Sequence, residues 1–212
     1  TEIQRLKRIV EEDGCAPPAE RPGRFREEAV AELYRKDLIQ KISIPDGTVG
    51  LKVAVDTGNG TGGPVIRSIL DALGVEAIYL FNEPDGNYPN HHPDPTVEES
   101  LDPLRETIQG EYCDLGIAMD GDADRVVFLD DRGQVVRGDQ ALAIFARDAL
   151  AAGPNAKILF EVKCSRLLPQ DIEAHGGIPV MGRTGHSFIK RRMKEEPEIA
   201  VYVLRGMHDY FY

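Results

Sequence analysis

Cysteine, long apolar stretches and positive charge are all scarce in this sequence. Its three cysteines, Cys15, Cys113 and Cys164, are scattered and odd in number, which favours a reducing, cytoplasmic setting over a disulfide framework. No apolar stretch is long enough to span a bilayer, so we expect neither a membrane partner nor a signal peptide. Acidic residues outnumber basic ones by 36 to 25, and the formal net charge is -11. Because such a field repels phosphate backbones, we do not expect a nucleic-acid partner.

The rest of the composition is that of a folded protein. The chain has 212 residues, of which 42% are hydrophobic, enough for one large domain or two ordinary ones. It begins at Thr1 rather than with methionine, so we expect a piece of a longer protein. An anionic small molecule can still bind where basic residues are locally concentrated.

Apolar periodicity predicts helices and short strands in alternation. We expect helices over residues 2–13, 24–42, 64–73, 97–109, 139–152, 167–175 and 186–195, and strands over 52–55, 77–81, 114–119, 126–129, 157–162 and 178–181. In the second of these helices, the buried stripe is expected to consist of Phe25, Ala29, Val30, Leu33 and Ile39.

This alternation implies an α/β fold, because β-α-β crossovers build largely parallel sheets that are covered on both faces. We predict two consecutive, mixed or mostly parallel α/β/α units, the second of them incomplete. Residues 1–24 would be the remnant of a preceding domain and a linker, residues 25–134 the first α/β domain, and residues 135–212 part of the second. Ligands of open α/β sheets bind where the strands end.

The most informative stretch is a short acidic loop between two expected strands. Asp120, Asp122 and Asp124 stand at alternate positions, and Arg125 follows at once. Carboxylates this close repel one another unless a cation binds between them, and hard oxygen ligands suit Mg²⁺ or Ca²⁺. We therefore predict a divalent-metal site made by the three aspartates, with Arg125 placed to hold an anion beside the metal.

Three other interpretations of this loop are weaker. An EF-hand needs glycine and glutamate where Arg125 and Asp131 stand, and its flanks are helices rather than strands. A haloacid-dehalogenase-type phosphatase usually has threonine or valine at the position of Asp124. A solvated acidic turn does not explain three alternate acids and an arginine between two buried strands.

Glycines cluster in the loop Asp56–Gly63, after one expected strand and before a helix. Gly58, Gly60 and Gly63, with Glu83 further on, satisfy the dinucleotide-binding fingerprint, and such a loop can hold phosphate at a helix N-terminus. A tight turn that needs glycine for close packing explains the same pattern at least as well. Both interpretations stay open at this point.

Two adjacent histidines, His91 and His92, lie in a long irregular segment over residues 85–96. They could ligate a metal ion, but neighbours in sequence rarely face the same point without special backbone geometry. Pro93 and Pro95 instead favour a rigid surface or interface loop.

Basic residues follow the last two expected strands. Lys163 lies at the end of one strand, and Arg183 and His186 follow the next and open a helix. Together they offer cations, backbone donors at a helix start and a group that titrates near neutral pH. We predict that Lys163, Arg183 and His186 bind substrate. The basic run over residues 190–194 is expected to be a solvated helix face, and Cys164 to pack in the core.

In this combination and order, the motifs resemble the α-D-phosphohexomutase family, in its bacterial phosphomannomutase/phosphoglucomutase branch. The resemblance covers about residues 2–195 and is carried by Val55-Asp56-Thr57-Gly58-Asn59-Gly60, Glu83 to Pro95, Asp120 to Arg125, Val162-Lys163-Cys164 and Thr184-Gly185-His186. It implies a four-domain enzyme that moves a phosphoryl group between the 1- and 6-positions of a hexose through a phosphoserine. Residues 25–134 would correspond to the second domain and residues 135–212 to the start of the third.

The resemblance also implies roles for individual residues. The three aspartates resemble the family's Mg²⁺ ligands, and Arg125 resembles the arginine that steadies the phosphoserine and the substrate. Lys163 and His186 resemble the pair that contacts the sugar hydroxyls and assists proton transfer. Arg125 and His186 are therefore the expected catalytic residues. The expected ligands are mannose or glucose 1- or 6-phosphate and the 1,6-bisphosphate.

The chain also departs from the family pattern. No segment resembles the loop that bears the phosphorylatable serine, and we expect the first and fourth domains to lie outside these residues. The sugar-selecting motif Gly-Glu-x-Ser-Gly-His is not matched near the C-terminus, where the sequence reads Arg205-Gly206-Met207-His208. The preferred epimer, the role of this segment and the oligomeric state stay open. We expect this polypeptide alone to be an inactive mutase fragment; the alternative is a non-catalytic module that binds metal and sugar phosphate.

Overall fold

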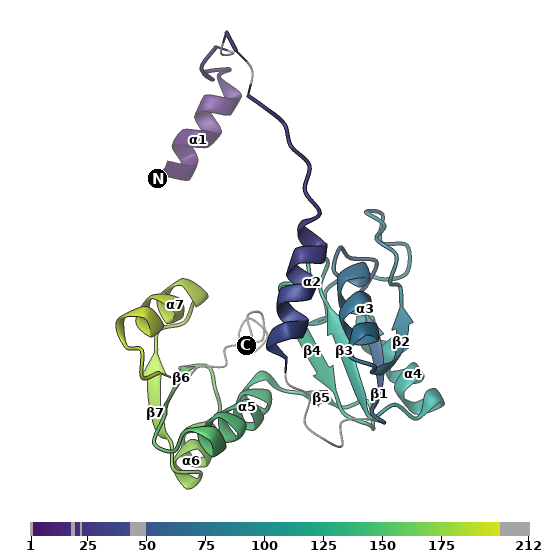
Figure 1. The fold of residues 1–212 in the computed structure, drawn as a ribbon, viewed down its shortest axis with the longest axis vertical. Coiled ribbons are helices and arrows are strands. Elements are labelled where there is room, and N and C mark those ends of the chain that lie inside the picture. The colour runs from purple at the N-terminus through teal and green to yellow at the C-terminus, as the bar shows by residue number, and fades with distance from the viewer. Residues whose placement is uncertain (1, 18–19, 22, 43–49, 200–212) are drawn as a thin grey trace. The chain divides into compact units, whose positions relative to one another are not determined.

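A computed structural model describes residues 2–17, 20–21, 23–42 and 50–199 of the chain, except for the side chain of His186 (Figure 1). The segment that departs from the family motif, residues 205–208, therefore lies outside the described residues. The chain divides into two compact units, residues 1–33 and residues 34–212.

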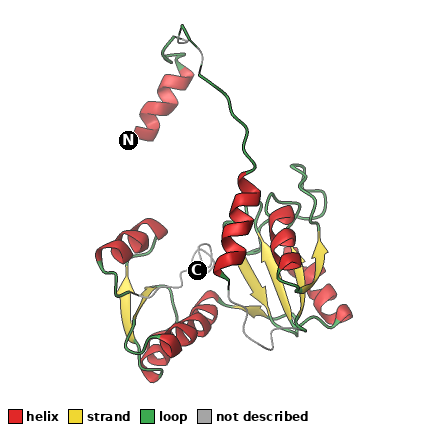
Figure 2. Cartoon of the chain, in the orientation of Figure 1, coloured by secondary structure: helices red, strands yellow, loops and turns green. Residues whose placement is uncertain are grey.

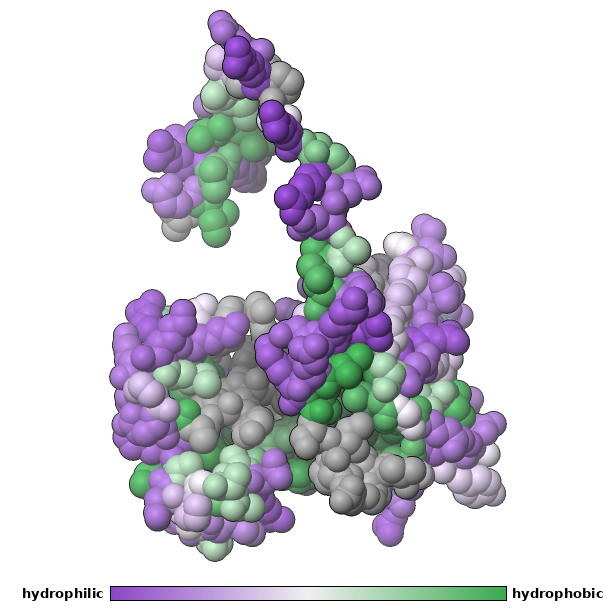
Figure 3. Space-filling view, viewed as in Figure 1, coloured by the Kyte–Doolittle hydropathy of each residue, from purple (hydrophilic) through white to green (hydrophobic). Residues whose placement is uncertain are grey.

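The N-terminal helices are shorter and more exposed than predicted. Helix α1 spans Glu2–Glu11 and helix α2 spans Val30–Lys41, and neither contains a buried residue in the described structure. The predicted buried stripe is wrong, since Phe25 precedes α2 and is 87% exposed, and Val30 and Leu33 are each 62% exposed. Figure 3 shows hydrophobic side chains exposed on the N-terminal segment. Apolar periodicity marks the face that a helix can bury, but a packing partner must be present to bury it.

The first α/β region carries a five-stranded mixed sheet (Figure 2). Its elements are β1 (Lys52–Asp56), α3 (Gly63–Ala72), β2 (Glu76–Leu80), the 3₁₀ helix η1 (Glu98–Leu101), α4 (Asp102–Glu111), β3 (Leu115–Met119), β4 (Val126–Leu129) and β5 (Val135–Val136). The strand order is β2-β1-β3-β4-β5. Strands β2, β1 and β3 pair in parallel, β4 pairs antiparallel with β3, and β5 pairs antiparallel with β4. The two-residue strand β5 was not predicted, because two residues show no periodicity.

Helix α4 closes the core of this region against the sheet. Leu104 and Ile108 are fully buried and pack with Ala54, Ala118 and their neighbours. Burial of such a side chain contributes about 1.5–3 kcal/mol. Because the side chains of a strand alternate between its two faces, the opposite face of β1 is left for α3, whose Ile69 is buried.

The second α/β region has a smaller sheet. Its elements are α5 (Gly138–Ala152), β6 (Lys157–Glu161), α6 (Leu167–Ala174), β7 (Ile178–Gly182) and α7 (His186–Glu195). Strands β6 and β7 pair in parallel as a two-stranded sheet among the described residues. Ile158 and Phe160 pack against α5 and α6, whereas Leu159 contacts Ile189 of α7. Two consecutive α/β units, mixed and mostly parallel, are therefore confirmed.

The three cysteines all lie among the described residues and are free. Cys113 is buried in the core of the first region, and Cys164 packs beside the core of the second. Burial raises the pKa of both thiols, which fits the predicted packing role of Cys164 rather than a nucleophile. None of the described helices combines the length and apolarity needed to cross a bilayer.

Candidate metal centre and substrate-binding residues

Three carboxylates converge in the loop that joins β3 to β4. One oxygen atom each of Asp120, Asp122 and Asp124 lies within 4.8 Å of the other two. Asp120 is 2% exposed, whereas Asp122 and Asp124 are exposed. Alternate spacing thus brings the three side chains together, as the sequence predicts.

Backbone hydrogen bonds explain why this loop is tight. The Asp120 amide donates to the Arg125 carbonyl oxygen at 3.3 Å, and the Ala123 amide donates to the Asp120 carbonyl oxygen at 3.0 Å. Ala123 has a left-handed backbone with φ of 56°, which a non-glycine residue adopts mostly in turns. The loop is therefore a closed turn between antiparallel strands, which rules out an EF-hand with its helical flanks.

Arg125 is held against the buried member of the triad. Its backbone amide donates to Asp120 Oδ1 at 2.9 Å, and its Nε donates to Asp120 Oδ2 at 2.7 Å. The same Nε lies 3.8 Å from Asp124 Oδ1. The Arg125 side chain, 35% exposed, thus lies beside the triad. Its positive charge is in position to bind an anion next to a metal ion held by the aspartates.

The donor set suits a hard divalent cation. Each carboxylate oxygen has two lone pairs, so the oxygens of Asp120 can still coordinate an ion while they accept from Arg125. Mg²⁺ commonly takes one or two carboxylates together with water and phosphate oxygens. Three converging carboxylates with two exposed members fit that requirement.

The glycine-rich loop after β1 packs directly on the acidic loop. The Thr61 amide donates to the Gly121 carbonyl oxygen at 2.9 Å. A Cβ on Gly60 would lie 2.7 Å from that same oxygen, and one on Gly62 would lie 2.5 Å from Ala123 Cβ. Close packing therefore accounts for these glycines, in favour of the tight-turn interpretation over the dinucleotide fingerprint.

The third glycine of the fingerprint is also explained by packing. Gly63 begins α3, and a Cβ there would collide with the Asn82 carbonyl oxygen after β2. Glu83 contacts the glycine-rich loop through its backbone, since the side-chain amide of Asn59 donates to the Glu83 carbonyl oxygen at 2.8 Å.

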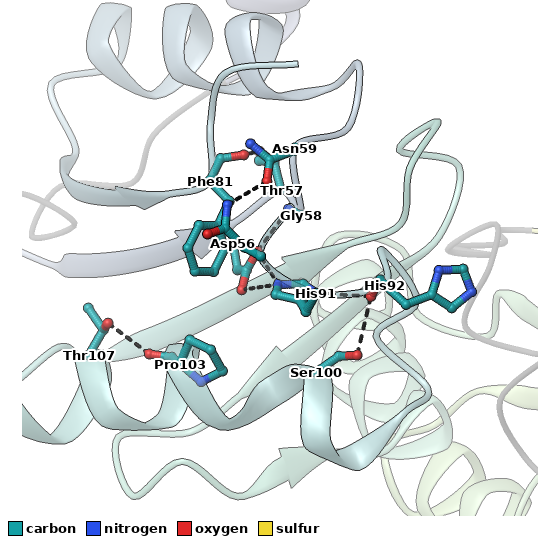
Figure 4. Close-up of polar contacts among 11 residues, drawn as sticks. Asp56, Thr57, Gly58, Asn59, Phe81, His91, His92, Ser100, Pro103 and Thr107 are labelled. Atoms are coloured by element: carbon teal, nitrogen blue, oxygen red, sulfur yellow. Dashed lines mark hydrogen bonds and ion pairs between the residues drawn. The ribbon is translucent and has the colours of Figure 1, made fainter. Parts of the chain in front are cut away.

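The adjacent histidines do not face the triad. The His91 ring contacts Asp56 at the end of β1 (Figure 4), with 3.0 Å between Nε2 and Oδ2. Among the described residues, the one cluster able to hold a metal is the aspartate triad, and it contains neither histidine. This placement supports the structural interpretation of His91.

Asp94 is a residue whose proximity to the site the sequence did not reveal. Burial alone would raise the pKa of this carboxyl, but hydrogen bonds from Thr96 and the positive charge of Arg125 outweigh it and lower the pKa. The charge of Arg125 therefore acts on a carboxyl of the loop after β2. The sequence offered a weak signal, an aspartate between two prolines, but no indication of the partner.

The predicted cations of the second region follow the ends of two paired strands. Glu161 of β6 is in register with Gly182 of β7, so Lys163 and Arg183 leave the sheet at the same edge. Lys163 is half-buried. It lines a surface hollow whose other charged residues are two arginines and two acids, Arg137, Arg147, Asp139 and Asp171. The Arg183 guanidinium lies 4.0 Å from the centre of the Phe188 ring.

The remaining predicted residue, His186, is described only by its backbone. It begins α7 immediately after Gly185, whose φ is 120°. The bounds of this helix are those predicted, and Lys190 in the basic run is exposed, as expected of a solvated face. The role of the His186 side chain stays a prediction.

Comparison with known proteins identifies the family. Residues 32–133 match phosphoglucomutase/phosphomannomutase, alpha/beta/alpha domain II, and residues 137–204 match alpha/beta/alpha domain III. The phosphomannomutase/phosphoglucomutase of Pseudomonas putida is 43% identical over 184 residues, which cover 87% of this chain and 39% of that protein. The phosphoglucomutase of Neisseria gonorrhoeae is 38% identical over 209 residues, which cover 99% of this chain and 44% of the relative.

The solved structures agree. A crystal structure of a phosphoglucomutase/phosphomannomutase family protein from Burkholderia thailandensis matches with a TM-score of 0.81 and 34% identity, covering 98% of this chain and 44% of the other. The chain thus spans less than half the length of these relatives. It belongs to the phosphoglucomutase/phosphomannomutase family, and it matches that family's second and third α/β/α domains.

Proposed function

We propose that this chain is the metal- and sugar-binding part of a Mg²⁺-dependent phosphohexomutase. The reaction would move a phosphoryl group between the 1- and 6-positions of mannose or glucose phosphate, with the 1,6-bisphosphate as intermediate. Family membership supports the substrate class. The observation that carries the proposal is the convergence of three carboxylates beside Arg125.

Each residue of the acidic loop has a role in this proposal. Asp120, Asp122 and Asp124 would hold Mg²⁺, which when bound would neutralise negative charge on the phosphoryl oxygens. Arg125 presents the planar fork of N–H donors that suits phosphate oxygens. Its tie to Asp120 fixes the guanidinium in position before substrate arrives.

The strand ends of the second region would bind the sugar. Lys163 and Arg183 supply positive charge for the phosphate and donors for hydroxyl oxygens. His186 would accept or return the proton of the reacting hydroxyl, because imidazole exchanges protons near neutral pH. We keep the limits 1–24, 25–134 and 135–212 as the proposed linker and domains.

The metal site is tested by titrating the chain with Mg²⁺ in a calorimeter. The double variant D122N/D124N should bind Mg²⁺ at least about tenfold more weakly, because two charged ligands are lost. The matched control is D131N, which removes one exposed acid from the next turn. Equal binding by the wild type and the double variant would contradict the proposal.

Catalysis is tested separately. The 212 residues should bind glucose 1,6-bisphosphate in the presence of Mg²⁺ but should not interconvert glucose 1- and 6-phosphate, because the phosphoserine is expected in another domain. Turnover by this polypeptide alone would contradict that expectation. Metal binding without any bisphosphate binding would contradict the proposed sugar-phosphate site, and bisphosphate binding by a full-length protein that shows no turnover would favour the non-catalytic alternative.

A further inference from the structure

The segment between β2 and η1 is anchored by one imidazole. We name residues 83–96 the histidine loop. The His91 side chain is 15% exposed, its Nε2 lies 3.0 and 3.2 Å from the two oxygens of Asp56, and its Nδ1 lies 2.9 Å from the His92 carbonyl oxygen. The edge-to-face contact with Phe81, at 5.2 Å between ring centres, fixes the ring plane. Figure 4 shows this ring between the end of β1 and its own loop.

Asp56 is a buried acid that depends on this contact. It is 2% exposed, and its Oδ1 accepts the Gly58 amide at 2.8 Å. Burial raises the pKa of Asp56, while the charge and hydrogen bond of His91 oppose that rise.

The residues on either side of His91 support the acidic loop. A Cβ on Gly121 would lie 3.1 Å from the Tyr88 hydroxyl and 3.3 Å from Pro93 Cγ, so both side chains lie close against this glycine. Gly121 separates Asp120 from Asp122. Tyr88 and Pro93 of the histidine loop therefore pack against the backbone that carries the three carboxylates.

The hydrogen-bond geometry determines how many protons the pair holds. The His92 carbonyl oxygen can only accept, so Nδ1 must carry a hydrogen. Nε2 faces a carboxyl group, so a second hydrogen must lie between Nε2 and Asp56, on one or the other. The pair thus holds one proton more than a neutral imidazole beside an ionised carboxylate.

We propose that His91 and Asp56 are positioning residues for the metal-binding loop, and that their hydrogen bonds hold the histidine loop against Gly121. This inference rests on the proposed metal site. Without these hydrogen bonds, the packing of Tyr88 and Pro93 against Gly121 would loosen, and Mg²⁺ affinity would fall.

The neighbouring histidine offers a matched control. His92 is exposed and contributes its backbone carbonyl to the contact, so H92Q should leave the hydrogen bonds of His91 in place.

The decisive variant is D56N. Its amide oxygen can still accept from Gly58, and its NH₂ group can donate to Nε2 of a neutral His91 whose Nδ1 donates to His92. Every hydrogen bond is kept without the extra proton. The opposite variant, H91F, keeps an aromatic ring against Phe81 but removes both hydrogen bonds.

The experiment measures the Mg²⁺ dissociation constant by calorimetry at pH 7, with circular dichroism as a check of folding. H91F should bind about tenfold more weakly than the wild type, the equivalent of one hydrogen bond. D56N, which keeps the hydrogen bonds, and H92Q should bind as the wild type does.

Two results would overturn the inference. If folded H91F binds Mg²⁺ like the wild type, His91 does not position the loop. If D56N or H92Q loses as much affinity as H91F does, the hydrogen bonds of His91 are not responsible. Should the wild type bind no Mg²⁺ at all, the metal site fails by itself, and amide exchange over residues 120–125 in H91F decides the positioning role: faster exchange than in the wild type supports it, and unchanged exchange refutes it.

Discussion

The strand ends of the two α/β regions are built differently. After β1 and β3, the loops interlock: Thr61 bonds to Gly121, Gly60 and Gly62 pack on the acidic loop, and Arg125 is tied to Asp120. After β6, Cys164 bonds to Glu161 and Ser165 bonds to Asp139, and among the described residues no backbone hydrogen bond joins this loop to the one after β7. Arg183 is exposed and stacks on the Phe188 ring of the helix that follows it, α7.

The difference has a physical reason. Three carboxylates repel one another, so a site that gathers them needs a rigid backbone to hold them in place. A flexible cation that contacts an anionic sugar phosphate can instead adjust when the ligand arrives. The first region thus holds a preformed candidate site, and the second presents adaptable side chains.

The largest expected effect is on the interlocked loops. G63A should destabilise the protein by about 3 kcal/mol, because a new Cβ would collide with the Asn82 carbonyl oxygen. The control G110A, in α4, meets nothing within 4 Å and should stabilise by about 0.5–1 kcal/mol. Urea unfolding measures both. Equal stability of the two variants would show that the close approach is absent.

Metal should act on one region alone. Mg²⁺ at 100 times its dissociation constant should stabilise the fold by about 2.7 kcal/mol and slow amide exchange over residues 119–125. Residues 182–185 should exchange at an unchanged rate. Hydrogen-exchange mass spectrometry compares the two segments. Protection confined to residues 182–185 would contradict a metal site in the first region.

The cations of the second region should matter for the sugar phosphate only. K163A and R183A should each weaken glucose 1,6-bisphosphate binding by about tenfold, the lower end of the range for a charge-assisted hydrogen bond. Mg²⁺ binding should not change. K190A removes an exposed charge from α7 and serves as the control. A loss of the same size in K190A would mean that net charge, rather than a site, drives binding.

The smallest effect concerns a surface ion pair in the second region. Arg147 bonds to Asp171 and lowers the pKa of that carboxyl. A lowered pKa gives stability that is present above the usual carboxyl pKa and is lost as the pH falls through the folded value. D171N should therefore flatten thermal stability between about pH 5 and pH 3. An unchanged acid profile in D171N would show that the pair does not contribute.

Most of the strands and helices, and the aspartate triad of the candidate site, could be predicted from the sequence. Strand and helix positions follow from short-range periodicity, and the carboxylate convergence follows from alternate spacing in a short loop. The helix expected over 24–42 begins only at Val30, and residues that were predicted to be buried, such as Val30 and Leu33, are exposed. Periodicity depends on the spacing of apolar residues along the chain, and it does not show whether another part of the protein packs against the apolar face.

The sequence by itself determined the alternation of strands and helices, the three acids beside an arginine and the glycines at a strand end, because each is a property of neighbouring residues. Only the tertiary structure decided that Gly60 packs on Gly121 and that His91 anchors its loop to Asp56. These contacts join segments roughly 30 to 60 residues apart. Which segments meet depends on how the whole sheet and its helices exclude water and fill space, and no local pattern encodes that.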